Sequence, residues 1–241
     1  MKKVCIITGG SSGIGLSIVK LFIDNNYHVF NLDVSPSPYG DFYHCDVRNV
    51  SQVSKIMNEI CHNHIIDVLV SNAGIHLSAN IEETSELDFD NLFSINVKGA
   101  YAAVKSVLPN MKKNRNGSII LMSSEQALIA KRNSFAYNLS KCALASMAKT
   151  TALDYAEFNI RANAVCPGTI ETPLYHQAID KYCKNTGNNK QNVHQEEESL
   201  QPLNRLGQPE EVAELVLFLA SNKAKFITGS LQVIDGGYTT Q

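Results

Sequence analysis

Short apolar runs of strand length alternate along the chain with longer segments in which apolar residues recur every three or four positions. The short runs predict strands over 4–7, 28–32, 42–45, 68–71, 118–122, 161–165 and 231–234. The longer segments predict helices over 14–25, 50–62, 86–112, 134–158 and 209–220. Alternating strands and helices are typical of a mainly parallel sheet with helices on both faces. We therefore expect a doubly wound α/β fold built on a seven-stranded sheet.

Two stretches interrupt this alternation. Between the second and third predicted strands, Pro36, Pro38 and Gly40 prevent a crossover helix, so we expect a loop or a single turn. The long segment between Thr172 and Gly207 is polar, and long polar insertions in compact domains are usually disordered or functional. We expect a mobile lid over about 173–207 that carries one or two short helices. Neither an internal repeat nor a flexible linker divides the chain, which indicates one domain over 1–241.

Composition narrows the classes of partner. Apolar residues make up 44% of the 241 residues, enough for a sizeable core, and the net charge of −2 favours neither nucleic acid nor an anionic membrane. No apolar run approaches the ~20 residues that span a bilayer, and the apolar stretch near the N-terminus is too short for a signal peptide. The six cysteines form no CxxC pair and no cluster with histidines at metal spacing. We expect a cytoplasmic protein with reduced thiols and no metal site.

A glycine-rich turn follows the first predicted strand and precedes the first predicted helix. Its sequence is Thr8-Gly9-Gly10-Ser11-Ser12-Gly13-Ile14-Gly15. In this context glycines let the backbone approach a pyrophosphate, and the helix N-terminus stabilises the phosphate charge. The glycine spacing is GxxxGxG rather than the more familiar GxGxxG, and such a turn is a weak signal until other residues support it.

Asp33 ends the second predicted strand. A carboxylate at this place can bind the adenosine ribose hydroxyls and would repel a 2′-phosphate. No Lys or Arg occurs between Asn31 and Gly40 or within the glycine-rich turn, which favours NAD over NADP. The alternative is a solvated Asp that merely ends a strand.

Tyr137 and Lys141 lie four residues apart in a predicted helix, so they share one face, one turn apart. A lysine ammonium beside a phenol stabilises the phenolate and lowers the Tyr pKa, which suits a general acid or base. Many helices carry this pair by chance on a solvated face, so the pair gains meaning only from the rest of the chain.

Several motifs agree in order and spacing with one family. The chain resembles the short-chain dehydrogenase/reductase family along essentially its whole length, which implies a Rossmann-like fold. The positions that match the cofactor-binding motifs are Thr8, Gly9, Ser11, Ser12, Gly13, Ile14, Gly15, Asp33, Asp46, Val47, Asn72, Ala73, Gly74, Pro167, Gly168, Ile170 and Thr172, with Tyr137 and Lys141. Ser71 departs from the pattern, since the family has Asn before Asn72-Ala73-Gly74. The C-terminal matches are Gly229 and Asp235-Gly236-Gly237.

The resemblance also implies the catalytic residues, which are Asn96, Ser124, Tyr137 and Lys141. Tyr137 would be the acid/base, and Ser124, 13 positions before it, would hydrogen-bond the reacting oxygen. Asn96 would hold a water that links Lys141 to solvent, although it could instead only tie down backbone. Thr172 and the backbone at Ile170 would fix the nicotinamide carboxamide. His76 is expected to line the pocket rather than to carry the proton.

The implied reaction is reversible hydride transfer between NAD(H) and an alcohol or carbonyl carbon. Ser124, Gln126, Arg132 and Tyr137 are the expected substrate contacts, with Lys131 as a further candidate. The segments around Ser124 and Thr172 resemble sugar- and hydroxyacid-oxidising members, D-aldohexose dehydrogenases among them, so we expect a sugar, a sugar acid or a hydroxy acid. A 3-oxoacyl-type or general carbonyl reductase stays open, as does a dinucleotide sensor without activity. The resemblance further implies a homotetramer.

Overall fold

Seven parallel strands form one sheet in the order β3-β2-β1-β4-β5-β6-β7. The computed structural model describes residues 2–240. The strands are β1 (Lys3–Thr8), β2 (Tyr27–Asp33), β3 (Asp41–His44), β4 (Val68–Ser71), β5 (Gly117–Met122), β6 (Ile160–Pro167) and β7 (Leu231–Ile234). All seven lie within two residues of the ranges predicted from the apolar runs. The five central strands are buried on both faces and so read as apolar runs, whereas the edge strands β3 and β7 are only partly buried.

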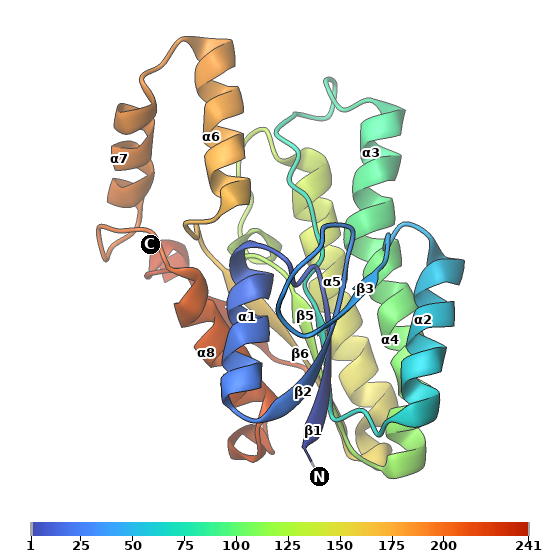
Figure 1. Ribbon diagram of the computed structural model, residues 1–241. Coiled ribbons are helices and arrows are strands. Elements are labelled where there is room, and N and C mark those ends of the chain that lie inside the picture. The colour runs from blue at the N-terminus through green and yellow to red at the C-terminus, as the bar shows by residue number, and fades with distance from the viewer. Residues whose placement is uncertain (1, 241) are drawn as a thin grey trace.

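Helices cover both faces of this sheet (Figure 1). On one face lie α1 (Gly13–Asp24) and α8 (Pro209–Ala220), and on the other lie α2 (Val50–Asn63), α4 (Gly99–Asn114) and α5 (Phe135–Tyr155). Strand β1 serves both cores, because successive side chains of a strand point to opposite faces. Val4 and Ile6 pack with the α2, α4 and α5 side, whereas Cys5 and Ile7 pack with the α1 and α8 side. The doubly wound α/β prediction is confirmed.

The predicted helix over 86–112 differs in one respect. The structure divides it into α3 (Glu86–Phe93), a π-helical turn (Ser94–Lys98) and α4. The wide turn contains Asn96, whose buried side chain bonds neighbouring segments instead of facing along the helix. Periodicity does not reveal such a turn, since one inserted residue shifts the apolar pattern only slightly. Single π-helical turns are often associated with functional sites.

Two helices, α6 (Pro173–Thr186) and α7 (Lys190–Leu200), stand beyond the carboxyl ends of the strands (Figure 1). Their common base is a short bridge in which the Glu171 N–H donates to the Gly207 carbonyl at 2.9 Å and the Gly207 N–H donates to the Thr169 carbonyl at 3.1 Å. The segment at 34–40 is irregular, as its prolines predicted. Within residues 2–240, no helix is both long and apolar enough to cross a membrane.

Candidate active site

The glycine-rich turn lies at the carboxyl end of β1, where open α/β sheets bind ligands. Gly9 and Gly13 have φ values of +69° and +50°, a region that side chains disfavour. A Cβ on Gly15 would stand 2.0 Å from the Gly9 carbonyl oxygen, so no side chain fits there. The Ser12 side chain makes no capping hydrogen bond at the start of α1. The glycines of the turn therefore pack tightly against each other, and the N–H groups at the start of α1 are left available to an anion.

Strand β4 supports this turn from one side. The Asn72 amide donates to the Gly9 carbonyl at 2.8 Å, and the backbone N–H groups of Asn72 and Ala73 donate to the Thr8 hydroxyl at 3.2 and 3.3 Å. On the other side, a Cβ placed on Gly13 would lie 3.3 Å from Thr172 Cγ2, so the turn and the start of α6 face each other closely. The predicted cofactor residues at the carboxyl ends of β1 and β4 and in the loop between β6 and α6 therefore lie around the glycine-rich turn.

Asp33 extends from β2 over the edge of the turn. One carboxylate oxygen accepts the Ser11 N–H at 3.0 Å, and the other accepts the Ser35 N–H at 2.9 Å. Each oxygen keeps a further lone pair for a ligand hydroxyl. Asp46 is engaged differently, since its carboxylate binds the Arg48 guanidinium at 2.7 Å, which lowers its pKa. A close-fitting glycine turn flanked by a carboxylate suits a dinucleotide.

The reacting end of the site is built on β5 and α5. Lys141, in the second turn of α5, is buried, and its ammonium donates to the Met122 carbonyl at 2.8 Å. The ammonium lies 5.3 Å from the Tyr137 ring centroid. Ser124 follows β5 and lies near enough to Tyr137 to lower the pKa of its phenol. The structure therefore brings Ser124, Tyr137 and Lys141 together.

Burial sets the charge states of this group. Burial lowers the pKa of Lys141 to about 8, although nearby Glu125 acts in the opposite direction. Burial raises the pKa of Tyr137, the charge of Glu125 raises it further, and neighbouring Ser124 acts in the opposite direction. The lowered Tyr137 pKa that the four-residue spacing predicted is therefore not found, because burial raises the pKa of Tyr137 while it lowers that of Lys141. Since the ammonium and the phenol ring are neighbours on α5, the two groups titrate as a coupled pair.

Asn96 joins this group through the π-helical turn. Its side-chain oxygen accepts the Ile75 N–H at 2.9 Å, and its amide donates to the Ile75 carbonyl at 3.0 Å and to the Ser140 hydroxyl at 3.1 Å. A Cβ on Gly74 would lie 3.3 Å from the Asn96 oxygen and 3.7 Å from the Lys141 nitrogen, so both groups border the same small space.

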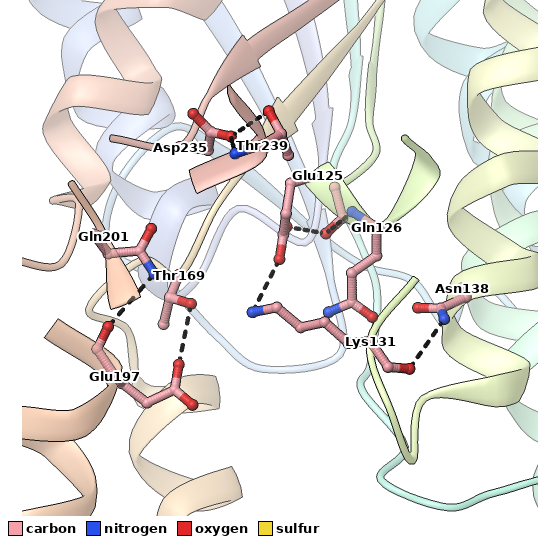
Figure 2. A network of polar contacts seen from close by, with 10 residues as sticks. Glu125, Gln126, Lys131, Asn138, Thr169, Glu197, Gln201, Asp235 and Thr239 are labelled. Carbon is pink, nitrogen blue, oxygen red and sulfur yellow. Dashed lines mark hydrogen bonds and ion pairs between the residues drawn. The ribbon is translucent and has the colours of Figure 1, made fainter. Parts of the chain in front are cut away.

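Glu125 is a site residue that the sequence reasoning missed. Its side chain is 3% exposed, and its carboxylate accepts the Ser124 hydroxyl proton. Its other oxygen lies 3.2 Å from the Lys131 ammonium, an ion pair that Figure 2 shows at the centre of the polar network. The available signal was a carboxylate directly after the candidate catalytic Ser, with a lysine six positions later.

His76, predicted to line the pocket, lies beside Tyr137. His76 packs edge-on against Tyr137 with 4.7 Å between ring centroids, and burial lowers its pKa to about 4, helped by Lys131, Lys141 and Lys181. It is neutral near pH 7 and suits a pocket wall.

Gln126 and Arg132, both predicted substrate contacts, differ in burial. Gln126 is 8% exposed, and its side-chain oxygen has no hydrogen-bond partner among the described residues. Arg132 is exposed, and over residues 2–240 no hydrogen bond or ion pair connects it to Ser124 or Tyr137.

Beyond β6, the loop that starts at Pro167 passes under the two projecting helices. The Gly168 N–H donates to the Ile234 carbonyl at 2.9 Å, which ties the loop to β7. The Thr169 hydroxyl lies 3.5 Å from the Glu197 carboxylate of α7 (Figure 2). Thr172 caps α6 by accepting the Tyr175 N–H at 3.2 Å. In the described part of the chain, no three His, Cys, Asp or Glu residues are grouped so as to hold a metal ion.

Comparison with known proteins gives consistent matches. The family model described as enoyl-(acyl carrier protein) reductase matches residues 9–239. A 3-oxoacyl-[acyl-carrier-protein] reductase, FabG of Thermotoga maritima, is 35% identical over 98% of this chain and 97% of its own.

Two solved structures are similar in fold as well as sequence. The ligand-free aldohexose dehydrogenase of Thermoplasma acidophilum superposes with a TM-score of 0.93 at 38% identity, covering 100% of this chain and 95% of its own. ElxO with NADP bound superposes with a TM-score of 0.91 at 34% identity, covering 100% of both chains.

Proposed function

Because the chain belongs to the short-chain dehydrogenase/reductase family, whose members are nicotinamide-dependent oxidoreductases of alcohols and carbonyls, we propose that it oxidises or reduces a small polar substrate with NAD(H). The reacting carbon would be that of a secondary alcohol or its ketone, as in a sugar, a sugar acid or a hydroxy acid. The observation that carries this proposal is the assembly of Ser124, Tyr137 and Lys141 around one point, at the carboxyl ends of β5 and the neighbouring strands.

The bound nicotinamide supplies the hydride acceptor or donor. Tyr137 takes the proton from the substrate hydroxyl during oxidation and returns it during reduction. Lys141 favours the phenolate through its charge, which burial strengthens. Ser124 holds the reacting oxygen beside Tyr137, and Asn96 keeps the backbone around Ile75 in place next to Lys141.

NAD is the proposed cofactor because of Asp33. Its carboxylate is partly exposed beside the turn and suits the two ribose hydroxyls, whereas a 2′-phosphate would meet a negative charge. Arg48, 54% exposed, is paired with Asp46, and the loop at 34–40 carries no cation. The ElxO structure holds NADP, so the cofactor preference of this chain has to be measured.

The two helices α6 and α7 are proposed as the substrate lid of a single domain. Their base is pinned at Glu171 and Gly207, while only Ile179 and Val193 among their side chains are buried. A pinned base with few buried side chains permits the outer part to move. The charge of Lys181 in α6 contributes to the lowered pKa of His76, which supports a position of α6 near the reacting group.

A homotetramer is proposed for the assembly. Leu153 of α5 is 81% exposed and Phe226, before β7, is fully exposed. Large exposed apolar side chains on a long helix and beside an edge strand favour burial between copies. Light scattering of the purified protein tests this, and a monomer at micromolar concentration contradicts it.

A 3-oxoacyl-type reductase is the second candidate, favoured by the identity to FabG over almost the whole chain. The third is a dinucleotide sensor without activity, which the intact Tyr137–Lys141 pair disfavours. Turnover assays with NAD(H) and NADP(H) should include sugars, sugar acids, hydroxy acids and 3-oxoacyl thioesters, with Tyr137→Phe as control. Turnover of thioesters alone supports the reductase. Tight NADH binding without any turnover supports the sensor, and equal turnover by the Tyr137→Phe variant contradicts the proposed role of Tyr137.

A further inference from the structure

A carboxylate lies against the very hydroxyl that the proposed reaction uses. The Glu125 carboxylate accepts a hydrogen bond from the Ser124 hydroxyl, and the Gln126 backbone N–H donates to the Ser124 oxygen at 3.2 Å. The side chains of Ser124 and Glu125 are both at most 4% exposed. Nothing in the proposed reaction requires an acid at this position, and a buried carboxylate carries a desolvation cost that a partner must offset.

This contact limits what Ser124 can do. A serine hydroxyl has one proton, and here it is donated to Glu125. While that bond persists, Ser124 has no proton to donate to the reacting oxygen. A substrate hydroxyl that replaces Ser124 as the donor to Glu125 would free the Ser124 hydroxyl to donate to the reacting oxygen, so the pair couples substrate structure to the arrangement of the site.

We propose that Glu125 is a specificity-determining residue that accepts a hydrogen bond from a hydroxyl on the carbon next to the reacting carbon. The Ser124 and Glu125 oxygens lie side by side about one hydrogen-bond length apart, and the two oxygens of a vicinal diol have a similar separation. The substrate class is thus a polyol or sugar in which the reacting carbon has a hydroxylated neighbour. This inference rests on the proposed function of the site.

The charges around Glu125 favour a neutral polyhydroxylated substrate over an anionic one. Lys131 pairs with Glu125 at 3.2 Å and lies 4.7 Å from the Tyr238 ring centroid, so its charge is compensated and its position is held. A carboxylate on the neighbouring carbon would face the Glu125 carboxylate and be repelled. Arg132, a predicted substrate contact, is exposed and is not among the hydrogen-bond and ion-pair partners of Ser124 and Glu125 within residues 2–240.

The test compares matched substrates that differ by one hydroxyl. D-glucose and D-mannose are compared with 2-deoxy-D-glucose, and butane-2,3-diol is compared with butan-2-ol, in each case by kcat/KM with NAD. A hydrogen bond to a charged group contributes about 1.5–3 kcal/mol, so the wild type should prefer the hydroxylated partner of at least one pair by roughly 10- to 150-fold. Glu125→Gln should reduce this preference by about tenfold or more. Glu157→Gln, which removes an exposed carboxylate in the 3₁₀ turn after α5, should keep it.

The ratio of two substrates is informative because a change of pH dependence in the variant affects both equally. A wild-type ratio near one overturns the inference, and this measurement needs no variant to fold. An unchanged ratio in Glu125→Gln, with NADH binding retained as evidence of folding, overturns it as well. If the wild type oxidises butan-2-ol or 2-deoxy-D-glucose as fast as the hydroxylated partners, the proposed function survives and only the inference fails. If it reduces and oxidises nothing with either cofactor, the proposed function itself fails.

Discussion

The replacement Asp33→Asn tests the proposed cofactor preference at a single position. The wild-type carboxylate accepts the Ser11 and Ser35 N–H groups with separate oxygens at 3.0 and 2.9 Å. Asparagine retains one acceptor oxygen and turns an NH₂ group toward the other N–H. The variant therefore loses the negative charge and also loosens the loop that follows β2.

Two effects determine the size of the change. Loss of a charged acceptor for the ribose hydroxyls weakens NAD binding by about 1.5–3 kcal/mol, or roughly 10- to 150-fold. For NADP, two phosphate charges about 5 Å from the carboxylate, in an effective dielectric constant of about 80, repel it by about 1.7 kcal/mol, and a lower dielectric constant would increase this. The two effects add, so the NAD-to-NADP preference should fall by about 3 kcal/mol or more, which is at least roughly a hundredfold.

The assay is kcat/KM for each cofactor at saturating substrate, followed through the absorbance of the reduced nicotinamide. Asp41→Asn is the matched control, because Asp41 begins the neighbouring strand β3 and pairs with His28 at 2.7 Å, away from the turn. The control should keep the wild-type preference. The reasoning is refuted if the wild type uses NADP as well as NAD, or if Asp33→Asn leaves the preference within about threefold of its original value.

Five further predictions concern the reacting group and the turn. Tyr137→Phe should lower kcat by about 10²- to 10⁴-fold with NADH affinity unchanged, as fluorescence titration would show, and unaltered kcat contradicts the role. During oxidation the Tyr137–Lys141 pair must have lost one proton before it can accept the proton of the substrate hydroxyl. Because the pKa of Lys141 is lowered to about 8, kcat/KM for oxidation should rise with pH and level off above about 8. Glu125→Gln should move this inflection to lower pH, because the Glu125 charge raises the pKa of both groups; a fixed inflection contradicts this. Asn96→Leu leaves two buried backbone groups unpaired and should cost about 2–5 kcal/mol in urea unfolding, with a loss under about 1 kcal/mol as the contrary result. Gly15→Ala places a Cβ 2.0 Å from a backbone oxygen and should abolish NADH binding, so normal affinity would contradict the tight packing of the turn.

The proposed lid shows that apolar periodicity misses some helices. The polar composition of the segment marks it as an insertion, but its apolar period is too weak to delimit α6 and α7. Their ends are nonetheless encoded locally, since Thr172 and Asn189 cap the starts of α6 and α7, and Gly187, with φ of +76°, ends α6. Capping residues act over a few positions and can be identified from sequence, whereas packing that buries only one side chain per helix leaves almost no periodic trace.

The sequence by itself determined which elements follow one another along the chain. It shows the seven apolar runs, the glycine-rich turn and the spacing of Tyr137 and Lys141. Those features follow from burial and from backbone geometry, which act on neighbouring residues and so appear as periods and motifs. Only the tertiary structure decided that Asn96 lies in a π-helical turn and that Glu125 accepts a hydrogen bond from the Ser124 hydroxyl while pairing with Lys131. These contacts depend on side-chain direction and on loops that fold back across the end of the sheet, and no repeating pattern in the chain encodes either.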